Sequence, residues 1–203
     1  MLEKLTNEQE AEIQNYLEKW LKVGYRTETQ DVEMAKEFVH FLYDKFLSLP
    51  VPEIYFVDSP LAGQKLINKL DNDGVEPDKG SLQYYEPARE NWWMSYFSKY
   101  DCVLNVLFPE EKSQFELFQK FLDYSENCHM MWALDKAVVI CDFPVSINAS
   151  KEIGLDSKFG PSVLYKDGYA TYALEGTSMD KEDWERETAK YKSTLAGEIF
   201  KKI

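Results

Sequence analysis

Three aspartates stand where carboxylates could do chemistry. Asp58 and Asp142 each directly follow a short apolar run, residues 54–57 and 137–141, and Asp156 lies further along the chain. Carboxylates that folding brings within a few ångströms can act as an acid/base pair or hold Mg²⁺. Asp58, Asp142 and Asp156 are therefore the candidate catalytic residues of one hypothesis, a small cytoplasmic enzyme with a carboxylate-lined site that could depend on a metal.

The same residues also fit structural roles. Asp58 precedes Ser59-Pro60, a pair typical of a helix start, and Asp142 precedes Phe143-Pro144, which is typical of a turn. A helix over about residues 60–70 would directly follow the strand at 54–57. Its first N–H groups and the positive end of its dipole would suit an anion, so Ser59 is a candidate binding residue.

Motifs for other chemistries are missing from the sequence. It contains no Walker A, G-x-G-x-x-G or G-x-S-x-G pattern, and its two histidines, His40 and His129, offer few bases for a hydrolase. The acidic stretch 71–74 lacks the ligand spacing of a calcium loop, and the adjacent Cys128 and His129 have no second ligand pair for zinc. We therefore expect no cofactor and no metal, with the carboxylate site as the alternative.

Aromatic residues supply the other candidate binding positions. Trp92, Trp93 and Tyr96 lie in a segment that would be apolar around most of a helix, which favours core packing or, alternatively, a partner-binding patch. Tyr165 and Tyr169 flank the turn at Asp167-Gly168 and complete the candidate binding set with Ser59.

Composition limits the partners. The formal net charge of -13 opposes binding to nucleic-acid phosphates and suits a basic protein partner, metal ions or simple solubility. No apolar run approaches the ~18 residues that cross a bilayer, and the N-terminus lacks the plan of a signal peptide. We expect a cytoplasmic protein with no membrane or nucleic-acid partner and with reduced cysteines. The oligomeric state is not specified.

Helical periodicity runs through most of the chain. Thr6 and Gln9 form a capping box for a helix over about residues 7–23, with Gly24 at the position after its end. The second helix begins near Asp31, and a further one opens at residues 109–111. The apolar stripe of the second comprises Ala35, Phe38, Val39, Leu42 and Phe46; the later helix would bury Phe115, Phe118, Phe121 and Leu122. A C-terminal helix begins at about Asp180 and carries a stripe of Trp184, Thr188, Tyr191, Leu195 and Ile199.

Turn signals place a hairpin in the last third. Asp167-Gly168 separates two β-rich runs and predicts a type I′ turn, and Glu175-Gly176 predicts a second turn. The predicted fold is α+β, a single domain over residues 1–203 with an exposed loop at 71–80. Its helical N-terminal half packs on a small, mostly antiparallel sheet made of 54–57, 137–141 and the 163–174 hairpin, followed by the terminal helix.

Three blocks suggest a family. They are W-L-K-V-G-Y-R-T-E-T at 20–29, D-S-P-L-A-G at 58–63, and G-P-S-V-L-Y-K-D-G-Y at 160–169 with L-E-G at 174–176. Their order and spacing over about residues 6–179 resemble an uncharacterised bacterial and phage domain family that also occurs joined to leucine-rich repeats. The resemblance implies a fold but no activity. The family pattern has cationic residues where this chain has Phe143, Asp156 and Glu175, so an activity that depends on them would be lost here.

Two hypotheses follow. The first is a non-catalytic protein-interaction module, such as a phage or mobile-element protein that binds a basic surface of a host protein. The acidic charge and the missing catalytic motifs favour it. The alternative is the carboxylate enzyme described above.

Overall fold

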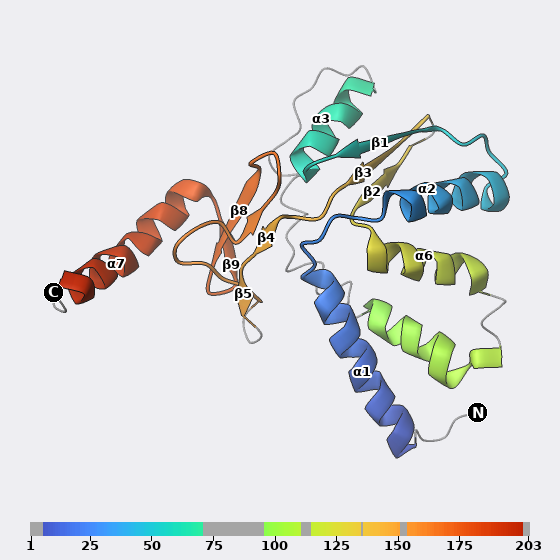
Figure 1. Ribbon diagram of the computed structural model, residues 1–203, viewed down its shortest axis with the longest axis horizontal. Coiled ribbons are helices and arrows are strands. Elements are labelled where there is room, and N and C mark those ends of the chain that lie inside the picture. Colours follow the sequence, from blue (N-terminus) through green and yellow to red (C-terminus); the bar gives the residue numbers. More distant parts are fainter. Residues whose placement is uncertain (1–5, 71–95, 111–114, 135, 151–153, 201–203) are drawn as a thin grey trace.

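A computed structural model describes residues 6–70, 96–110, 115–134, 136–150 and 154–200, the last nine of them by their backbone alone. The loop predicted at 71–80 and the candidates Trp92 and Trp93 lie outside these residues. A body of helices around a small sheet is followed by a C-terminal β module and a helix that extends to one side (Figure 1). The predicted α+β class is confirmed.

The first helix, α1 (Asn7–Gly24), starts as predicted. The Thr6 side chain accepts from the Gln9 backbone N–H at 3.2 Å, and the Gln9 side chain accepts from the Thr6 N–H at 2.9 Å. Gly24 is the last residue of the helix and Tyr25 is the C-cap, so the helix ends one residue later than predicted and Gly24 does not follow its end. The buried Trp20 and Val23 fix α1 against Leu104 and Leu122.

The second helix changes its hydrogen-bonding pattern part-way. Helix α2 (Val32–His40) is capped by Asp31, which accepts from the Met34 N–H at 3.0 Å, and it continues into a π-helix, η1 (Phe41–Phe46). Leu47 N–H bonds to the Leu42 carbonyl five residues back, at 2.9 Å.

A three-stranded sheet forms the centre of the body. Its order is β1 (Glu53–Val57), β3 (Ala137–Cys141) and β2 (Met131–Ala133), with β1 parallel and β2 antiparallel to β3. All of β3 is buried. Its Val138 and Ile140 pack with α2 and α6 (Glu116–Asn127), whereas Cys141 packs with the C-terminal module. The strand that the sequence predicted to be buried on both faces is buried in this way.

Helices cover the rest of the body. Helix α3 (Pro60–Leu70) follows β1 and contacts β1 and β3. Residues 96–102 are helical and continue into a second π-helix, η2 (Val103–Leu107), which contacts α1. The buried Asp101 carboxylate joins them, because it accepts from Trp20 Nε1 at 2.9 Å, Asn105 Nδ2 at 2.6 Å and Lys19 Nζ at 3.1 Å.

The C-terminal module has sheets of its own. One has the order β4 (Ser146–Ile147), β7 (Val163–Leu164), β8 (Ala170–Leu174), β9 (Thr177–Met179); the other pairs β5 (Ala149–Ser150) with β6 (Gly154–Leu155). The single sheet predicted from 54–57, 137–141 and the hairpin was therefore wrong. Strand β3 already has neighbours on both of its edges, so the hairpin packs near the end of β3 and pairs with β4 and β9 instead.

The two turns of the module differ from the prediction in type. Gly168 has φ 87°, but Asp167 is not among the residues with positive φ, and Gly168 N–H bonds to the Tyr165 carbonyl at 3.0 Å. The hairpin loop thus has three residues, closed by Tyr165 and Tyr169, instead of a two-residue type I′ turn. Glu175 and Gly176 both have positive φ, 52° and 78°, and form the I′-like turn between β8 and β9.

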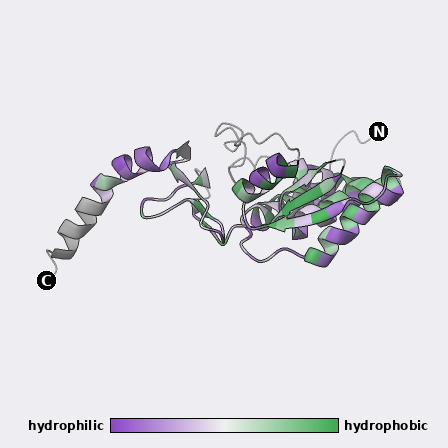
Figure 2. Cartoon of the chain, turned by 90° about the horizontal axis from the view of Figure 1, so that it is seen from above, coloured by the Kyte–Doolittle hydropathy of each residue, from purple (hydrophilic) through white to green (hydrophobic). Residues whose placement is uncertain are grey.

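The last helix, α7 (Lys181–Phe200), leaves the module. Asp180 caps it by accepting from the Asp183 N–H at 2.8 Å, and Trp184 and Thr188 are buried. The rest of the helix extends away from the body (Figure 1). Apolar residues concentrate on the central strands (Figure 2). Within the described part of the chain, no helix has the length and apolar character needed to cross a membrane.

Candidate functional site

The carboxyl ends of β1 and β3 meet the hairpin loop. We call this contact the junction and define it by Asp58, Ser59, Asp142, Tyr165 and Asp167. Asp58 and Asp142 directly follow paired parallel strands, and Asp142 N–H donates to the Val57 carbonyl at 2.9 Å. The carboxyl edge of parallel strands is a common ligand site in α/β proteins, so the polar groups of the junction are the first candidates for a site.

Ser59 is fully buried at the junction. Its Oγ donates to Asp167 Oδ2 at 2.6 Å and accepts from the Ala62 N–H at 3.1 Å. The hydroxyl thus caps α3 and binds the hairpin loop at the same time. A carboxylate of the chain itself occupies the place beside the helix N-terminus that the sequence suggested for an anion.

The three candidate carboxylates serve separate partners. Asp142 Oδ1 accepts from the Gln30 and Phe143 N–H groups, at 3.1 and 2.8 Å, which stabilises a turn. Asp58 forms an exposed ion pair with Lys166 at 3.7 Å. Asp156 Oδ1 accepts from the Glu175 N–H at 2.8 Å in the turn between β8 and β9. Among the described residues, no three His, Cys, Asp or Glu side chains are arranged to hold a metal ion.

Aromatic rings enclose the one histidine near the junction. His129 Nε2 lies 3.4 Å from the hydroxyl oxygen of the buried Tyr165, and its ring is 5.0 Å from that of Phe143. The Arg26 guanidinium lies 5.3 Å from the centre of the Phe143 ring and donates to the Glu126 carbonyl. The Tyr165 and Tyr169 rings are 5.8 Å apart. Arg26, Ser59 and Tyr165 come from the three sequence blocks, so the structure brings all three blocks together here.

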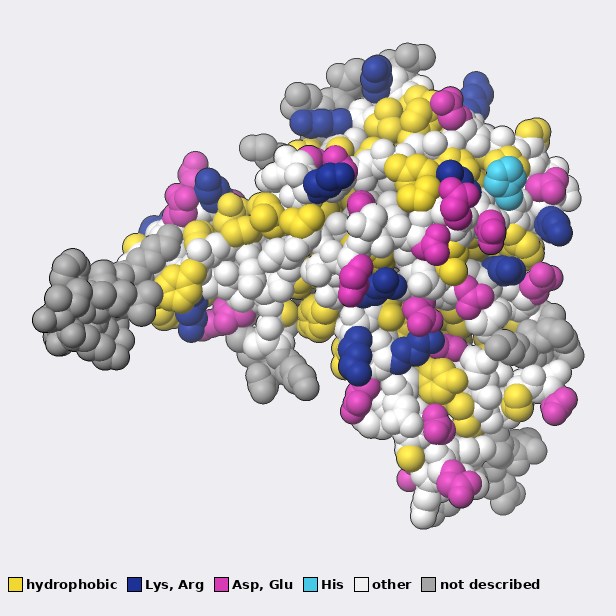
Figure 3. Space-filling view, in the orientation of Figure 1, with side chains coloured by type: hydrophobic (Ala, Val, Ile, Leu, Met, Phe, Trp, Pro, Cys, Tyr) yellow, Lys and Arg dark blue, Asp and Glu magenta, His cyan; other side chains and the backbone are white. Residues whose placement is uncertain are grey.

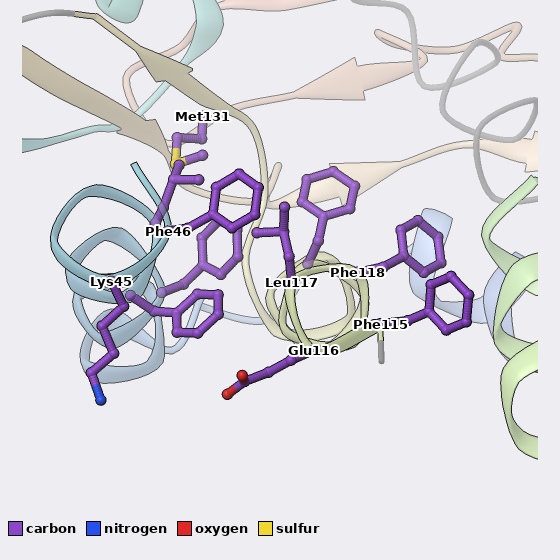
Figure 4. Close-up of a pocket in the computed structure, with 11 residues that line it drawn as sticks. Lys45, Phe46, Phe115, Glu116, Leu117, Phe118 and Met131 are labelled. Atoms are coloured by element: carbon purple, nitrogen blue, oxygen red, sulfur yellow. The ribbon is translucent and has the colours of Figure 1, made fainter. Parts of the chain in front are cut away.

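The second candidate is an apolar groove between η1 and the start of α6, which we call the groove. Its volume is about 740 Å³, within the range of ligand sites. Six phenylalanines line it, namely Phe38, Phe41, Phe46, Phe115, Phe118 and Phe121, together with Leu42, Leu117 and Met131. Figure 4 shows Phe46 and Leu117 between the two helices, Met131 at one end, and Lys45 and Glu116 extending at the other.

Two residues of this groove were predicted to be core residues. Phe46 is 55% exposed and Phe115 is 46% exposed, so both predictions were wrong. The stripe that ends at Phe46 was extrapolated at 3.6 residues per turn, but the π-helix adds a residue to the turn and shifts the register. Phe115 precedes α6 and is not on its buried face, because the helix begins at Glu116. No sequence signal marked the π-helix.

Backbone irregularity accompanies the groove. π-Helical segments are rare in proteins, and those that occur are often found at functional sites. The π-helix η1 forms one wall of the groove. Directly after it, Ser48 has φ 55°, a left-handed conformation that costs a non-glycine residue about 1 kcal/mol. Leu47 and Leu49 on either side are 44% and 50% exposed. The apolar surface therefore continues beyond the groove along residues 46–49.

A polar hollow of about 500 Å³ adjoins the groove and shares Phe41, Lys45 and Glu116 with it. Its charged lining residues are Glu33, Glu37, Asp44 and Glu116, with Lys36, Lys45, Lys120 and His40. The Lys36 ammonium is paired with Glu33 at 2.7 Å. Carboxylates and lysines thus both stand beside the apolar surface, so the hollow is mixed in charge.

A phenol and a thiol lie in the core below the groove. The ring of Phe38, which lines the groove, lies 4.8 Å from that of the buried Tyr124, and Cys128 belongs to the same cluster. Burial raises the pKa of the Cys128 thiol to about 12 and the pKa of the Tyr124 phenol well above its usual value. Both groups therefore stay protonated at neutral pH.

Tyr96, the remaining candidate binding residue, lies apart from these groups. It is half-buried at the start of the helical segment 96–102, where the Lys99 ammonium lies 5.3 Å from the centre of its ring.

Comparison with known proteins gives no match, whether to a family model, to a curated protein or to a solved structure. The family resemblance of the three blocks stays a prediction.

Proposed function

We propose that the protein is a non-catalytic interaction module whose groove binds an amphipathic, positively charged helix of a partner protein. The observation that carries this proposal is the groove itself, where Phe46 stays exposed between two helical walls and Phe115 stays exposed at the start of α6 (Figure 4). Recognition of a helix in a groove uses such a surface, because the apolar face of the bound helix replaces water on the exposed rings.

Charge supports a basic partner. The chain has 36 acidic and 23 basic residues, and acidic side chains alternate with hydrophobic patches over the body in Figure 3. Carboxylates at Glu37, Asp44 and Glu116 stand next to the groove. Such a field would raise the association rate of a cationic segment, and added salt would reduce this effect.

A peptide-display selection on the purified protein tests the proposal. We expect enriched peptides to combine large apolar residues at i and i+4 with Lys or Arg. Their affinities, measured by fluorescence anisotropy, should fall at least about tenfold with Phe46→Asp, because a groove centre carries most of the binding energy. Phe159→Asp is the matched control, since Phe159 is 64% exposed but lies in the C-terminal module. Selected peptides that bind the Phe46→Asp protein as tightly as wild type would contradict the proposal.

The carboxylate-lined enzyme is the alternative. Its support is the position of Asp58 and Asp142 at the ends of paired parallel strands, and against it stand the separate partners of each carboxylate. A metal-dependent version predicts that Mg²⁺ or Mn²⁺ raises the melting temperature and that Asp58→Asn removes the rise. A melting temperature that does not respond to either ion would speak against it.

A further inference from the structure

Helix α7 continues well beyond the residues that pack on the C-terminal module. Its first turns are fixed to the C-terminal module, where Trp184 Nε1 donates to the Ser157 carbonyl at 2.6 Å and the Trp184 ring lies 5.1 Å from that of Tyr172. Thr188 is the last fully buried residue of the described part of this helix. The backbone nevertheless stays helical to Phe200 and extends away from the rest of the protein (Figure 1).

The charge of this C-terminal segment is opposite to that of the body. Residues 190–203 contain four lysines and one glutamate, which gives a net charge of +3. The whole chain has a net charge of -13, so the other 189 residues together carry -16. Within the segment, the Tyr191 hydroxyl donates to Glu175 Oε1 of the same chain at 3.3 Å, and Leu195 and Ile199 follow at four-residue spacing on the same face of the helix. The segment is thus basic, and its helical part up to Phe200 has apolar residues on one face.

Resting on the proposed function, we propose that the groove of one copy binds the C-terminal segment of α7, residues 190–203, of a second copy. The segment provides apolar residues for Phe41, Phe46 and Leu117 of the groove. Its lysines are attracted by the net negative charge of the body, although beside the groove the carboxylates of Glu37, Asp44 and Glu116 stand together with Lys36, Lys45 and Lys120. The match is therefore one of apolar surface at the groove and of opposite net charge between the segment and the body.

The direction of α7 indicates that the segment bound in the groove belongs to another copy of the chain. The helix points away from the body on the side opposite to η1, so it does not lie against the groove of its own chain (Figure 1). Each copy offers one segment and one groove. Two copies can therefore exchange segments in a closed dimer, and head-to-tail contacts would give larger assemblies.

Sedimentation velocity tests this association on the full chain. We expect a concentration-dependent dimer or larger species that dissociates with added salt. A chain that ends at Tyr191 should be monomeric with an unchanged melting temperature, because the buried Trp184 and Thr188 remain in it. In the full chain, Phe46→Asp should also give a monomer and Phe159→Asp should not. A full chain that stays monomeric at all concentrations overturns the inference.

A synthetic peptide of residues 190–203 tests the site. We expect it to bind the shortened chain, and its affinity should fall at least about tenfold with Phe46→Asp but stay unchanged with Phe159→Asp. Equal binding to both variants overturns the inference. If the peptide does not bind but display-selected peptides still require Phe46, the proposed function stands and the self-association fails. If neither kind of peptide requires Phe46, both fail.

Discussion

The junction and the groove use their side chains in opposite ways. At the junction, Ser59, Asp142 and Asp167 each bond to a group of the same chain. In the groove, Phe46 and Phe115 are about half exposed. A buried polar group must find a partner inside the protein, whereas an exposed aromatic ring stays available to another molecule.

This difference reverses the roles that residue type suggests. The carboxylates and the serine that looked chemical connect two parts of the fold, and the phenylalanines that looked like core form the surface available for binding. Chemical reactivity of a side chain is thus a poor guide to function when its donors and acceptors are already satisfied. The predictions below test each region separately.

Replacement of Ser59 should have the largest effect. Ser59→Ala removes the cap of α3 and leaves Asp167 Oδ2 without its Ser59 donor, and we expect a loss of about 2–4 kcal/mol in the free energy of unfolding. Urea denaturation measures it. Asp58→Ala is the matched control, because the exposed Asp58–Lys166 pair contributes less than about 1 kcal/mol. Equal losses in the two variants would mean that the junction is not held by the buried hydroxyl.

A methyl group at Gly63 should have the next largest effect. A Cβ there would lie 2.6 Å from Trp132 Cζ3, so Gly63→Ala must displace the indole or the helix. We expect a loss of about 1–3 kcal/mol in unfolding free energy. Gly160→Ala is the control, since no atom lies within 4 Å of a Cβ at that position. An unchanged urea midpoint for Gly63→Ala would show that α3 is not closely packed on β2.

Alkaline pH should lower stability gradually through the core beneath the groove. The unfolded chain loses the Cys128 proton near pH 9 and the folded chain near pH 12, so the folded state binds more protons between these values. Its stability is therefore complete below about pH 9 and falls as the pH rises towards 12. Urea midpoints measured across this range, with Cys128→Ala as the reference, check the trend. A wild-type slope no steeper than that of Cys128→Ala would rule out this thiol as the cause.

Substitution in the groove should have the smallest effect on stability. Phe46→Asp is expected to change the unfolding free energy by less than about 0.5 kcal/mol, because the side chain is more than half exposed. Thermal melting measures this change. A loss as large as that of Ser59→Ala would place Phe46 in the core after all and remove the contrast between the two regions.

Local signals in the sequence were sufficient for many elements. The capping box at Thr6 and the Asp31 start give the first two helices, and the apolar run before Asp142 gives a strand buried on both faces. The Ser59-Pro60 helix start was also correct. Each depends on contacts between residues close in the chain, which a sequence shows directly.

Contacts between distant residues were predicted less well. The partner of Ser59 is 108 residues away, and the choice between one sheet and three separate sheets depended on which strand took the free edge of β3. The hairpin turn type depended on how the loop closes and on the Asp167 carboxylate, which also accepts from the Tyr169 N–H at 3.0 Å. The groove depended on a π-helix that no residue pattern marked.

The sequence by itself determined the α+β class, the starts of α1, α2, α3 and α7, the strands β1 and β3, and the opposite net charges of the body and the C-terminal segment, because these follow from composition, periodicity and local capping. Only the tertiary structure decided which polar groups satisfy one another and which aromatic rings stay exposed. The physical reason is that burial and hydrogen-bond satisfaction are properties of neighbours in space, and those neighbours are set when the helices and sheets pack together.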